Sequence, residues 1–439
     1  MDFLTEDVKK LYRKFLAASL GSALVMSIYS FVDTIAVGQS EGPVGSSAMA
    51  VITPLYGIIV FLAILCGIGG SVLMGSARGE GNEEKGNAHF TASILVMGLL
   101  TVAVWLMFGV FHKQIFTFFG ADAEIMPKVM EYAQWIIWFF PVFIAPTFIS
   151  SSIRNDGAPG LAMAAVVIGG CVNIFGDWFL VFPLGMGMKG AAIATVIGTS
   201  LQVLIMCGHF LSKKCRLKLI RPYDMWHSMR NIFAIGFGAS VLELGTVTIA
   251  IMMNNQVMRY GGTTELAVYG VIASVGSLFQ ALFGGVGQAI QPLVSANHGA
   301  GNTERIQSFW KMSYATVLVL GVLFTCIGEF FPVRLVRLFV DATPEVVEAA
   351  PTVVRLSYLI YLFLGTTVLS TYYLQSTMHD KMSMLIAVLR GIVIDGLLIF
   401  VLPVFLGING VWLALPCSEL IVAGIALWFI YGRGSAKAL

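Results

Sequence analysis

Gly79-Glu80-Gly81-Asn82 returns 220 residues further along the chain as Gly299-Ala300-Gly301-Asn302. Other marks recur in the same order at the same offset: Phe119 as Phe339, Pro183 as Pro403, and Gly187-Met188-Lys189-Gly190 as Gly407-Ile408-Asn409-Gly410. Chance recurrence of loop residues explains one such match, but it poorly explains four in register. We therefore predict an internal duplication. Duplicated bundles of membrane helices are typical of transporters whose substrate path lies between two related halves.

The composition predicts a membrane protein. Hydrophobic residues make up 57% of the 439 residues, charged residues only 11%, and the mean hydropathy is +0.86. A soluble domain carries about 25% charged residues, so this chain has too few to cover a water-facing surface. The formal charge of +2 and the scattered basic residues argue against nucleic acid as a partner.

No cofactor and no cleavable leader are expected. The six cysteines form no C-x-x-C pair, so neither a disulfide framework nor a metal site is indicated. The first apolar run is too long for a signal peptide and lacks a cleavage site of small residues. A G-x-x-x-x-G-K-[ST] run is missing from the sequence, which disfavours transport driven by ATP.

Runs of about 20 apolar residues match a hydrocarbon core roughly 30 Å thick. They predict an all-α polytopic membrane protein with twelve transmembrane helices, at 15–38, 48–74, 90–111, 129–150, 161–182, 190–211, 231–257, 266–294, 308–331, 353–374, 384–405 and 409–431. The links between them are rich in glycine, proline, asparagine and charge, as turns at a membrane surface are.

The spans divide the chain into five parts. We expect an amphipathic segment at 1–14 on the membrane surface, a first six-helix lobe at 15–211, a linker at 212–230, a second six-helix lobe at 231–431 and a tail at 432–439. Cytoplasmic loops carry an excess of Lys and Arg. With the N-terminus inside, 19 of the 26 basic residues fall on the cytoplasmic side. Both termini and the linker are therefore predicted to be cytoplasmic.

Acidic residues within the spans are the main functional candidates. An ionisable residue in a span costs at least about 2.5–3.5 kcal/mol, so it is expected to face the interior of the bundle. Five acids qualify: Asp33, Asp177, Glu243, Asp395 and Glu419. We expect no Lys or Arg at comparable depth, so the interior should be acidic and should favour cations as cargo and as coupling ions.

Three residues of the first half share one depth. Asp33, Asp177 and Thr195 each lie five or six residues from the outer end of their span, which is roughly 8–9 Å below the outer interface. Asn173 lies one helical turn from Asp177 on the same face. Such an oxygen-rich pocket can hold a small hard cation or a proton. The alternative is that the two acids hydrogen-bond the backbone at helix breaks or face a solvated vestibule.

The acids of the second half are open to two interpretations. Glu243, Asp395 and Glu419 lie near mid-span, but the duplication does not pair them with acids of the first half. Asp395 corresponds to Phe175, and Asp177 corresponds to Leu397. Each acid is either a contact for substrate or ion, or a structural acid whose charge is satisfied by its neighbours.

Three motifs carry a resemblance to a known family. Residues 27–38 (SIYSFVDTIAVG) are similar to the first-helix signature of the multidrug and toxic compound extrusion (MATE) family. Residues 173–177 (NIFGD) resemble its fifth-helix N-x-x-x-D element, and residues 190–195 (GAAIAT) resemble its sixth-helix entry. The resemblance covers essentially the whole chain, and the bacterial DinF-like and MepA-like branch is the nearest.

The resemblance implies two pseudo-symmetric six-helix lobes around a central V-shaped cleft, and export of cationic or amphipathic compounds by antiport with H⁺ or Na⁺. Carried over residue by residue, the coupling site falls on Asp33, Asn173, Asp177 and Thr195. No metal is implied beyond Na⁺ at those four residues. Many members carry a proline fifteen residues before the first-helix acid, where this chain has Ala18, which puts in doubt a mechanism based on bending at that proline.

The chain is expected to be a monomer in the bacterial cytoplasmic (inner) membrane, with small cationic or amphipathic molecules and membrane lipids as partners. The runner-up is a flippase for lipid-linked precursors, or a metabolite exporter, of the same superfamily. Flippases carry anionic pyrophosphate cargo and should show basic residues in the cleft. An enzyme is disfavoured, because the chain has neither paired aspartate-rich magnesium motifs nor a G-x-G-D near a second acid.

Overall fold

The computed structural model describes residues 2–121, 123, 125–222, 224–337 and 344–433, except for the side chains of some residues within the helices. Regular structure in these ranges is entirely helical. The repeat mark Phe339 and most of the predicted tail at 432–439 lie outside them. The chain forms two compact units, Met1–Glu6 with Arg13–Gly236, and Asp7–Tyr12 with Phe237–Leu439.

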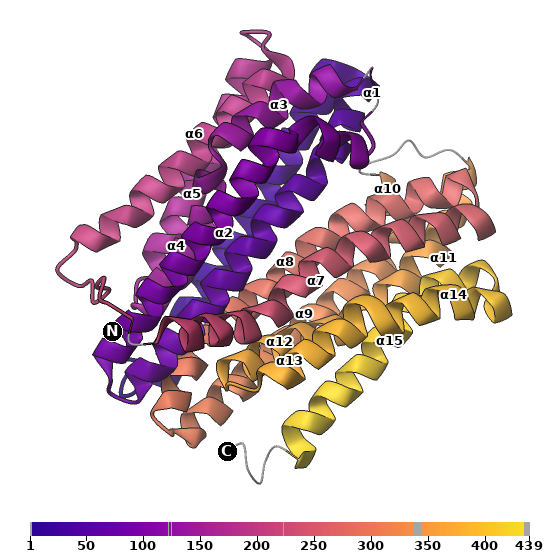
Figure 1. Ribbon diagram of the computed structural model, residues 1–439. Coiled ribbons are helices and arrows are strands. Elements are labelled where there is room, and N and C mark those ends of the chain that lie inside the picture. Colours follow the sequence, from indigo (N-terminus) through magenta and orange to yellow (C-terminus); the bar gives the residue numbers. More distant parts are fainter. Residues whose placement is uncertain (1, 122, 124, 223, 338–343, 434–439) are drawn as a thin grey trace. The chain divides into compact units, whose positions relative to one another are not determined.

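Figure 1 colours the first unit from indigo to pink. Its helices are α1 (Val8–Gly79) from Arg13 onward, α2 (Glu83–Phe118), α3 (Met126–Trp138), α4 (Phe140–Asn155), α5 (Pro159–Val181), α6 (Gly187–Cys207), the 3-10 helix η1 (Gly208–Leu211) and the start of α7 (Met225–Tyr260). The helices of the second unit are the rest of α7, α8 (Thr263–Gly299), α9 (Thr303–Phe330), α10 (Pro332–Arg337), α11 (Pro344–Tyr358), α12 (Tyr361–Ser376), α13 (Asp380–Val388), the π-helix η2 (Leu389–Ile394), α14 (Asp395–Leu406), α15 (Ile408–Trp428) and the π-helix η3 (Phe429–Arg433).

The repeated Gly-x-Gly-Asn stretch makes the same turn in both units. Gly81 and Gly301 have φ values of +79° and +68°, a left-handed conformation that glycine adopts without steric cost. The asparagine that follows caps the next helix in each case. The Asn82 side chain accepts a backbone N–H of α2 at 2.9 Å, and the Asn302 side chain accepts one of α9 at 3.4 Å. The duplication therefore preserves the local chemistry that ends one helix and starts the next.

The helices are those of a multi-pass membrane protein. Among the described residues, nine helices are long and apolar enough to cross a membrane, and the pair α3–α4, bent by 57°, raises the number to ten when it is taken as one span. The other two predicted spans, 15–38 and 231–257, fall on α1 and α7, where several side chains lie outside the described part. Helical backbone covers most of each predicted span, and the spans 129–150 and 353–374 are each divided by a short break, between α3 and α4 and between α11 and α12.

A single run of helical backbone covers the first two predicted spans, where the sequence predicts two helices and a link. This helix, α1, nevertheless reverses direction, because both of its ends contact the same end of α4. The Arg154 guanidinium donates to the Ser19 hydroxyl at 2.8 Å, and Arg78 donates to Asp156 at 2.7 Å. The two halves of α1 therefore run antiparallel, as two membrane spans must.

The reversal of α1 lies close to Gly45. A Cβ atom on this glycine would lie 3.3 Å from Val37, which is eight residues earlier. In a straight α-helix eight residues span about 12 Å, so the axis must bend sharply between these positions. Because Gly45 carries a hydrogen in place of a Cβ atom, it leaves the space that the bend requires.

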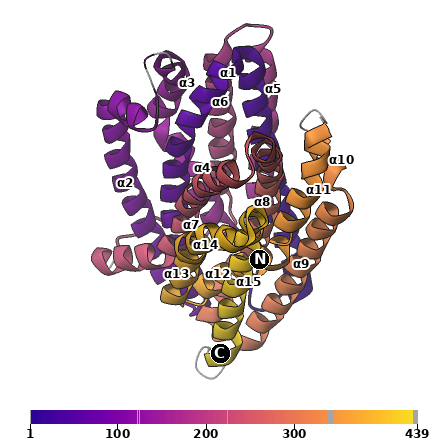
Figure 2. The same cartoon turned by 90° about the vertical axis from the view of Figure 1, so that its right-hand side faces the viewer.

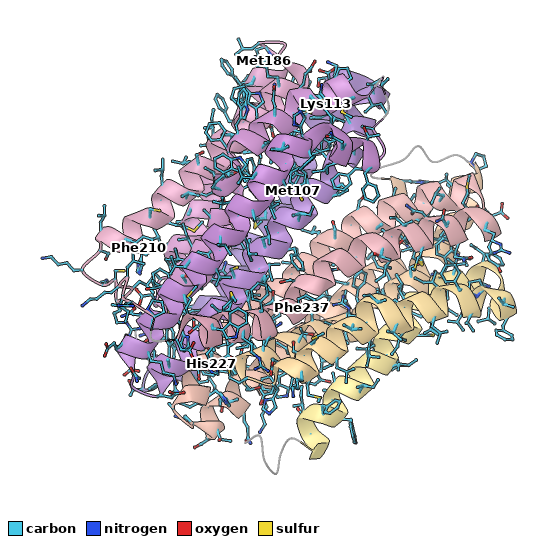
Figure 3. All side chains as sticks on the ribbon, in the orientation of Figure 1. Met107, Lys113, Met186, Phe210, His227 and Phe237 are labelled. Atoms are coloured by element: carbon cyan, nitrogen blue, oxygen red, sulfur yellow. The ribbon has the colours of Figure 1, made fainter. Side chains whose placement is uncertain are left out.

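The segment between the units is attached to the first unit. Alternate backbone N–H groups bond to side chains of the bundle: Arg216 to Asp156 (3.0 Å), Lys218 to Asn87 (3.2 Å) and Ile220 to Thr91 (3.0 Å). This alternation is that of an extended chain, in which every second residue faces the same side. Figure 3 places Phe210 and His227 toward one end of the first unit, and Lys113 and Met186 toward the other.

The change from the first unit to the second falls inside α7, between Gly236 and Phe237. The start of α7 packs on the second half of α1 through glycines. A Cβ on Gly236 would overlap the backbone of Leu65, and a Cβ on Gly69 would overlap that of Ile232. The first three turns of α7 are therefore held against α1 by backbone contact.

Aromatic rings fill the centre of the second unit, where α8, α9 and α12 pack on one another (Figure 2). Phe279 of α8 stacks on Phe324 of α9, with ring centroids 3.9 Å apart and planes at 2°. Tyr361 of α12 meets Phe279 edge to face at 5.2 Å. These contacts fix one wall of the unit.

Glycines also bring α5 and α6 together. A Cβ on Gly169 would lie 2.6 Å from the carbonyl oxygen of Gly198, and a Cβ on Gly198 would lie 2.7 Å from that of Gly169. Small residues let membrane helices approach closely. The contact places Asn173 of α5 opposite Thr195 of α6, with 3.3 Å between Nδ2 and Oγ1.

Gly198→Ala is expected to push α5 and α6 apart. Overpacking of a close contact costs about 1–3 kcal/mol, so the midpoint of thermal unfolding in detergent should fall. Gly160→Ala on α5 is the matched control, because its new Cβ would meet no atom within 4 Å. Equal midpoints for the two variants would show that the glycine contact is not needed.

Candidate functional site

The four residues predicted as a cation site all lie in the first unit. Asp33 comes from α1, Asn173 and Asp177 from α5, and Thr195 from α6. Each is buried, and Asp177 is fully so, with 0% of its surface exposed. The α5–α6 glycine contact explains why two of the three helices meet here, and the first half of α1 brings the third.

Tyr132 of α3 links these residues. Its hydroxyl donates to Asp33 Oδ2 at 3.1 Å and lies 3.5 Å from Thr195 Oγ1. The Tyr56 hydroxyl lies 3.1 Å from the Tyr132 hydroxyl. Neither tyrosine is among the site residues predicted from the sequence. The signal for Tyr132 was its place inside an apolar span, because a tyrosine hydroxyl in such a place needs a polar partner.

The hydrogen bonds leave several oxygen atoms unused. The Thr195 hydroxyl donates to the Ala191 carbonyl at 2.9 Å and accepts from Asn173 Nδ2. Among the described residues, no hydrogen-bond partner is found for Asp33 Oδ1, Asn173 Oδ1 or either carboxylate oxygen of Asp177. The alternative that Asp177 bonds to the backbone is therefore not supported.

The oxygen atoms without a hydrogen-bond partner determine which ligands the site can bind. The negative charge of Asp33 acts on Asp177, so two like charges lie close together in one buried site. Carboxylate, amide and hydroxyl oxygens are the ligands that hard cations prefer. A proton or a small cation would relieve the repulsion and give the oxygens a partner.

The acids of the second unit differ from one another. Glu243 lies in α7, and its side chain is outside the described part of the structure. Glu419 of α15 is satisfied by its neighbours: Arg390 Nε donates to Oε1 at 2.5 Å, and the Thr367 hydroxyl donates to Oε2 at 2.5 Å. Asp395, at the start of α14, is buried with its Oδ1 unpaired among the described residues.

The expectation that no basic residue lies as deep as the acids is wrong. Arg390 is only 8% exposed and forms a buried ion pair with Glu419. Arg390 is one of the 19 basic residues that the predicted orientation places on the cytoplasmic side. Its partner lies 29 residues further along the chain on another helix, so the local sequence gives no sign of the pairing.

A second polar cluster joins Asp156, His209 and Cys215, whose ligand-type atoms lie within 4.8 Å of one another. Its geometry does not favour a metal. The Asp156 carboxylate is already matched by Arg78 at 2.7 Å and by His209 Nε2 at 2.7 Å. Burial raises the pKa of the Cys215 thiol, which keeps it protonated and makes it a poor ligand. The cluster attaches the inter-unit segment to the bundle.

Comparison with known proteins agrees with the duplication. One family model, described as MatE, matches residues 18–179 and again residues 239–401. The multidrug export protein MepA of Staphylococcus aureus (strain MSSA476) is 24% identical over 93% of this chain and 90% of that protein. The MepA of Staphylococcus haemolyticus (strain JCSC1435) is 23% identical over the same shares.

Solved structures confirm the fold. An outward-facing multidrug resistance MATE family transporter of the MOP superfamily matches with a TM-score of 0.92 at 19% identity, over 99% of this chain and 97% of that chain. A MOP superfamily transporter from Pyrococcus furiosus, for which a reversed polarity of the binding pocket suggests a different function, matches with a TM-score of 0.90 at 20% identity, over 99% and 97%.

The predicted fold, twelve membrane helices in two related halves, is confirmed by these matches. The family model covers most of the chain, once in each half. The chain therefore belongs to the MatE family, and it is a transporter, not an enzyme.

Proposed function

We propose that the chain is a secondary active exporter of cationic or amphipathic compounds, driven by antiport with H⁺ or Na⁺. The observation that carries the proposal is the pair of buried carboxylates in the first unit. Three of their four oxygen atoms lack a hydrogen-bond partner among the described residues. Such a pair is costly in an apolar bundle unless it binds a cation in the transport cycle. The name of the relative MepA, a multidrug export protein, supports the same function.

Coupling follows from charge. When Asp33 and Asp177 are both ionised, they repel each other and attract a cationic drug. A proton or Na⁺ bound between them relieves the repulsion and weakens the attraction, because it neutralises one of the two negative charges. Linkage is reciprocal, so each ligand weakens the binding of the other by the same factor. Tyr132 and Asn173 would hold the two carboxylates in place through the hydrogen bonds of the site.

The proposal includes place and partners. The chain acts as a monomer in the bacterial cytoplasmic membrane, with both termini and the 212–230 linker in the cytoplasm, since most of its basic residues then lie inside. Its cargo consists of small organic molecules, and lipids surround it. Export then runs from the cytoplasm to the outside.

A flippase or metabolite exporter with anionic cargo is the second candidate. It would need basic side chains that are free to meet the cargo. Arg390 and Arg154, which are buried in the described part of the structure, are already engaged, Arg390 with Glu419 and Arg154 with Ser19 and Ser150. The site of the first unit is acidic. The charges therefore favour cations.

Asp33→Asn and Asp177→Asn should each abolish coupled efflux while the protein still folds. Each change removes a buried charge without creating a cavity. The measurement is resistance of a hypersensitive strain, together with the amount of protein in the membrane. Glu80→Gln, an exposed surface acid, is the control and should keep full activity. Parental resistance in both aspartate variants would rule out this coupling site.

Drug affinity of the purified protein should fall as the pH is lowered or as Na⁺ is raised, because the coupling ion competes through charge with a cationic drug. Asp33→Asn should flatten that dependence. Binding is measured at separately varied pH and Na⁺, and the response identifies the coupling ion. A drug affinity that changes with neither pH nor Na⁺ would contradict the competition, although it would not contradict the membership of the family.

The orientation can be tested by cysteine labelling from outside the cell, in a background without the six native cysteines. Lys113→Cys and Lys214→Cys are suitable sites because both residues are exposed. A membrane-impermeant maleimide should modify the first and spare the second. Strong labelling of the second alone would reverse the orientation.

A further inference from the structure

The second unit contains a cavity of about 350 Å³ whose lining belongs to that unit alone. This volume lies within the roughly 300–1,000 Å³ of small-molecule pockets. Aromatic and charged side chains face it together: Tyr269, Tyr358, Tyr361, Trp412, Asp395 and the Arg390–Glu419 pair. The cavity shares no residue with the cation site of the first unit.

One negative charge of the cavity is unmatched. Glu419 is neutralised by Arg390, and its second oxygen accepts from Thr367. Asp395 is 97% buried, since only 3% of its surface is exposed, and its Oδ1 has no hydrogen-bond partner among the described residues. The cavity therefore carries a net charge of −1 when all three groups are ionised.

The π-helix η2 explains how the pair and the free acid reach the same cavity. Arg390 lies in η2, and Asp395 follows it directly. Residues five apart on a regular α-helix point about 140° away from each other. In a π-helix, hydrogen bonds join residues five apart, so such residues lie one turn apart on the same side. The wider turn thus presents both side chains to the cavity, where both are found.

The remaining walls are lined by aromatic rings, of which Tyr269 is partly exposed whereas Tyr358 and Trp412 are buried. The rings of Tyr358 and Tyr361 lie 5.0 Å apart at 88°, and those of Tyr269 and Trp412 lie 6.0 Å apart. Aromatic faces attract cations. The Tyr358 hydroxyl is buried without a partner among the described residues.

We propose that this cavity is a binding pocket for a singly charged aromatic cation, with Asp395 as its counter-charge. The Arg390–Glu419 ion pair sets the net charge of the pocket. Arg390 neutralises the Glu419 carboxylate, so this group does not attract a second positive charge. The inference rests on the proposed function: the pocket is where the second unit holds the exported cation. The coupling site of the first unit remains separate.

Two dyes test whether the pocket favours a ligand with a single positive charge. Ethidium and propidium share one aromatic ring system, but ethidium carries one positive charge and propidium carries two. Binding is followed by dye fluorescence on the full-length protein at fixed pH and Na⁺. The background is Asp33→Asn/Asp177→Asn, in which the first unit offers no carboxylate. Ethidium should bind about tenfold more tightly than propidium, since the pocket matches only one charge. Equal affinities, or tighter binding of propidium, would overturn the proposed preference for a single positive charge.

Variants then locate the pocket. Adding Asp395→Asn should weaken ethidium binding by about tenfold to a hundredfold, as expected for the loss of a charged partner. Tyr358→Phe removes only the hydroxyl and should weaken binding by a smaller factor. Glu348→Gln, an exposed acid of the same unit, is the matched control and should bind as its background does.

The possible outcomes distinguish a failure of the pocket proposal from a failure of the proposed function. If the Asp33→Asn/Asp177→Asn background loses ethidium binding, the dye binds in the first unit and the pocket proposal fails, while the coupling site stands. If Asp395→Asn binds ethidium as the background does, the pocket proposal also fails. If Asp395→Asn does not fold, the dye comparison and Tyr358→Phe decide alone: unchanged ethidium affinity in Tyr358→Phe would overturn the proposal.

Discussion

A charge inside hydrocarbon must find a partner, and two arrangements occur in this chain. In the first unit, Asp33 receives one hydrogen bond from Tyr132, and among the described residues no partner is found for its other oxygen or for either oxygen of Asp177. In the second unit, the two carboxylate oxygens of Glu419 accept from Arg390 and Thr367. An open carboxylate can exchange partners during a cycle, whereas a closed one stabilises a wall. In the proposed mechanism, the transport cycle therefore uses the carboxylates whose oxygens remain unpaired.

The duplication repeats the turns between helices but not the charged residues within the spans. Gly81 and Gly301 adopt the same left-handed conformation, and the asparagine after each caps a helix. The charged residues do not follow the repeat, because Asp177 corresponds to Leu397. Turn geometry depends on one or two residues, so it persists in both copies. Side-chain chemistry within the spans is free to differ between the two units.

The sequence predicts most of the fold, because hydropathy, loop residues and an internal repeat are all local signals. It also indicated Asp33, Asn173, Asp177 and Thr195, since distance from the end of a span can be counted. It could not supply contacts between distant segments. Tyr132 meets Asp33 across 99 residues. The Arg390–Glu419 pair and the π-turn beside it depend on packing that no short window contains, which is why a deep arginine was not expected.

The passage between the units inside α7 has a mechanical consequence. A loop would absorb movement, but a helix is stiff along its axis and transmits it. The first three turns of α7 are held on α1 by the backbone contacts at Gly69 and Gly236, so one end of the helix is fixed within the first unit. The rest of the helix, from residue 237 to 260, is about 36 Å long. If α7 tilts by about 10° about residue 236, its far end moves by roughly 6 Å, about the length of one helical turn.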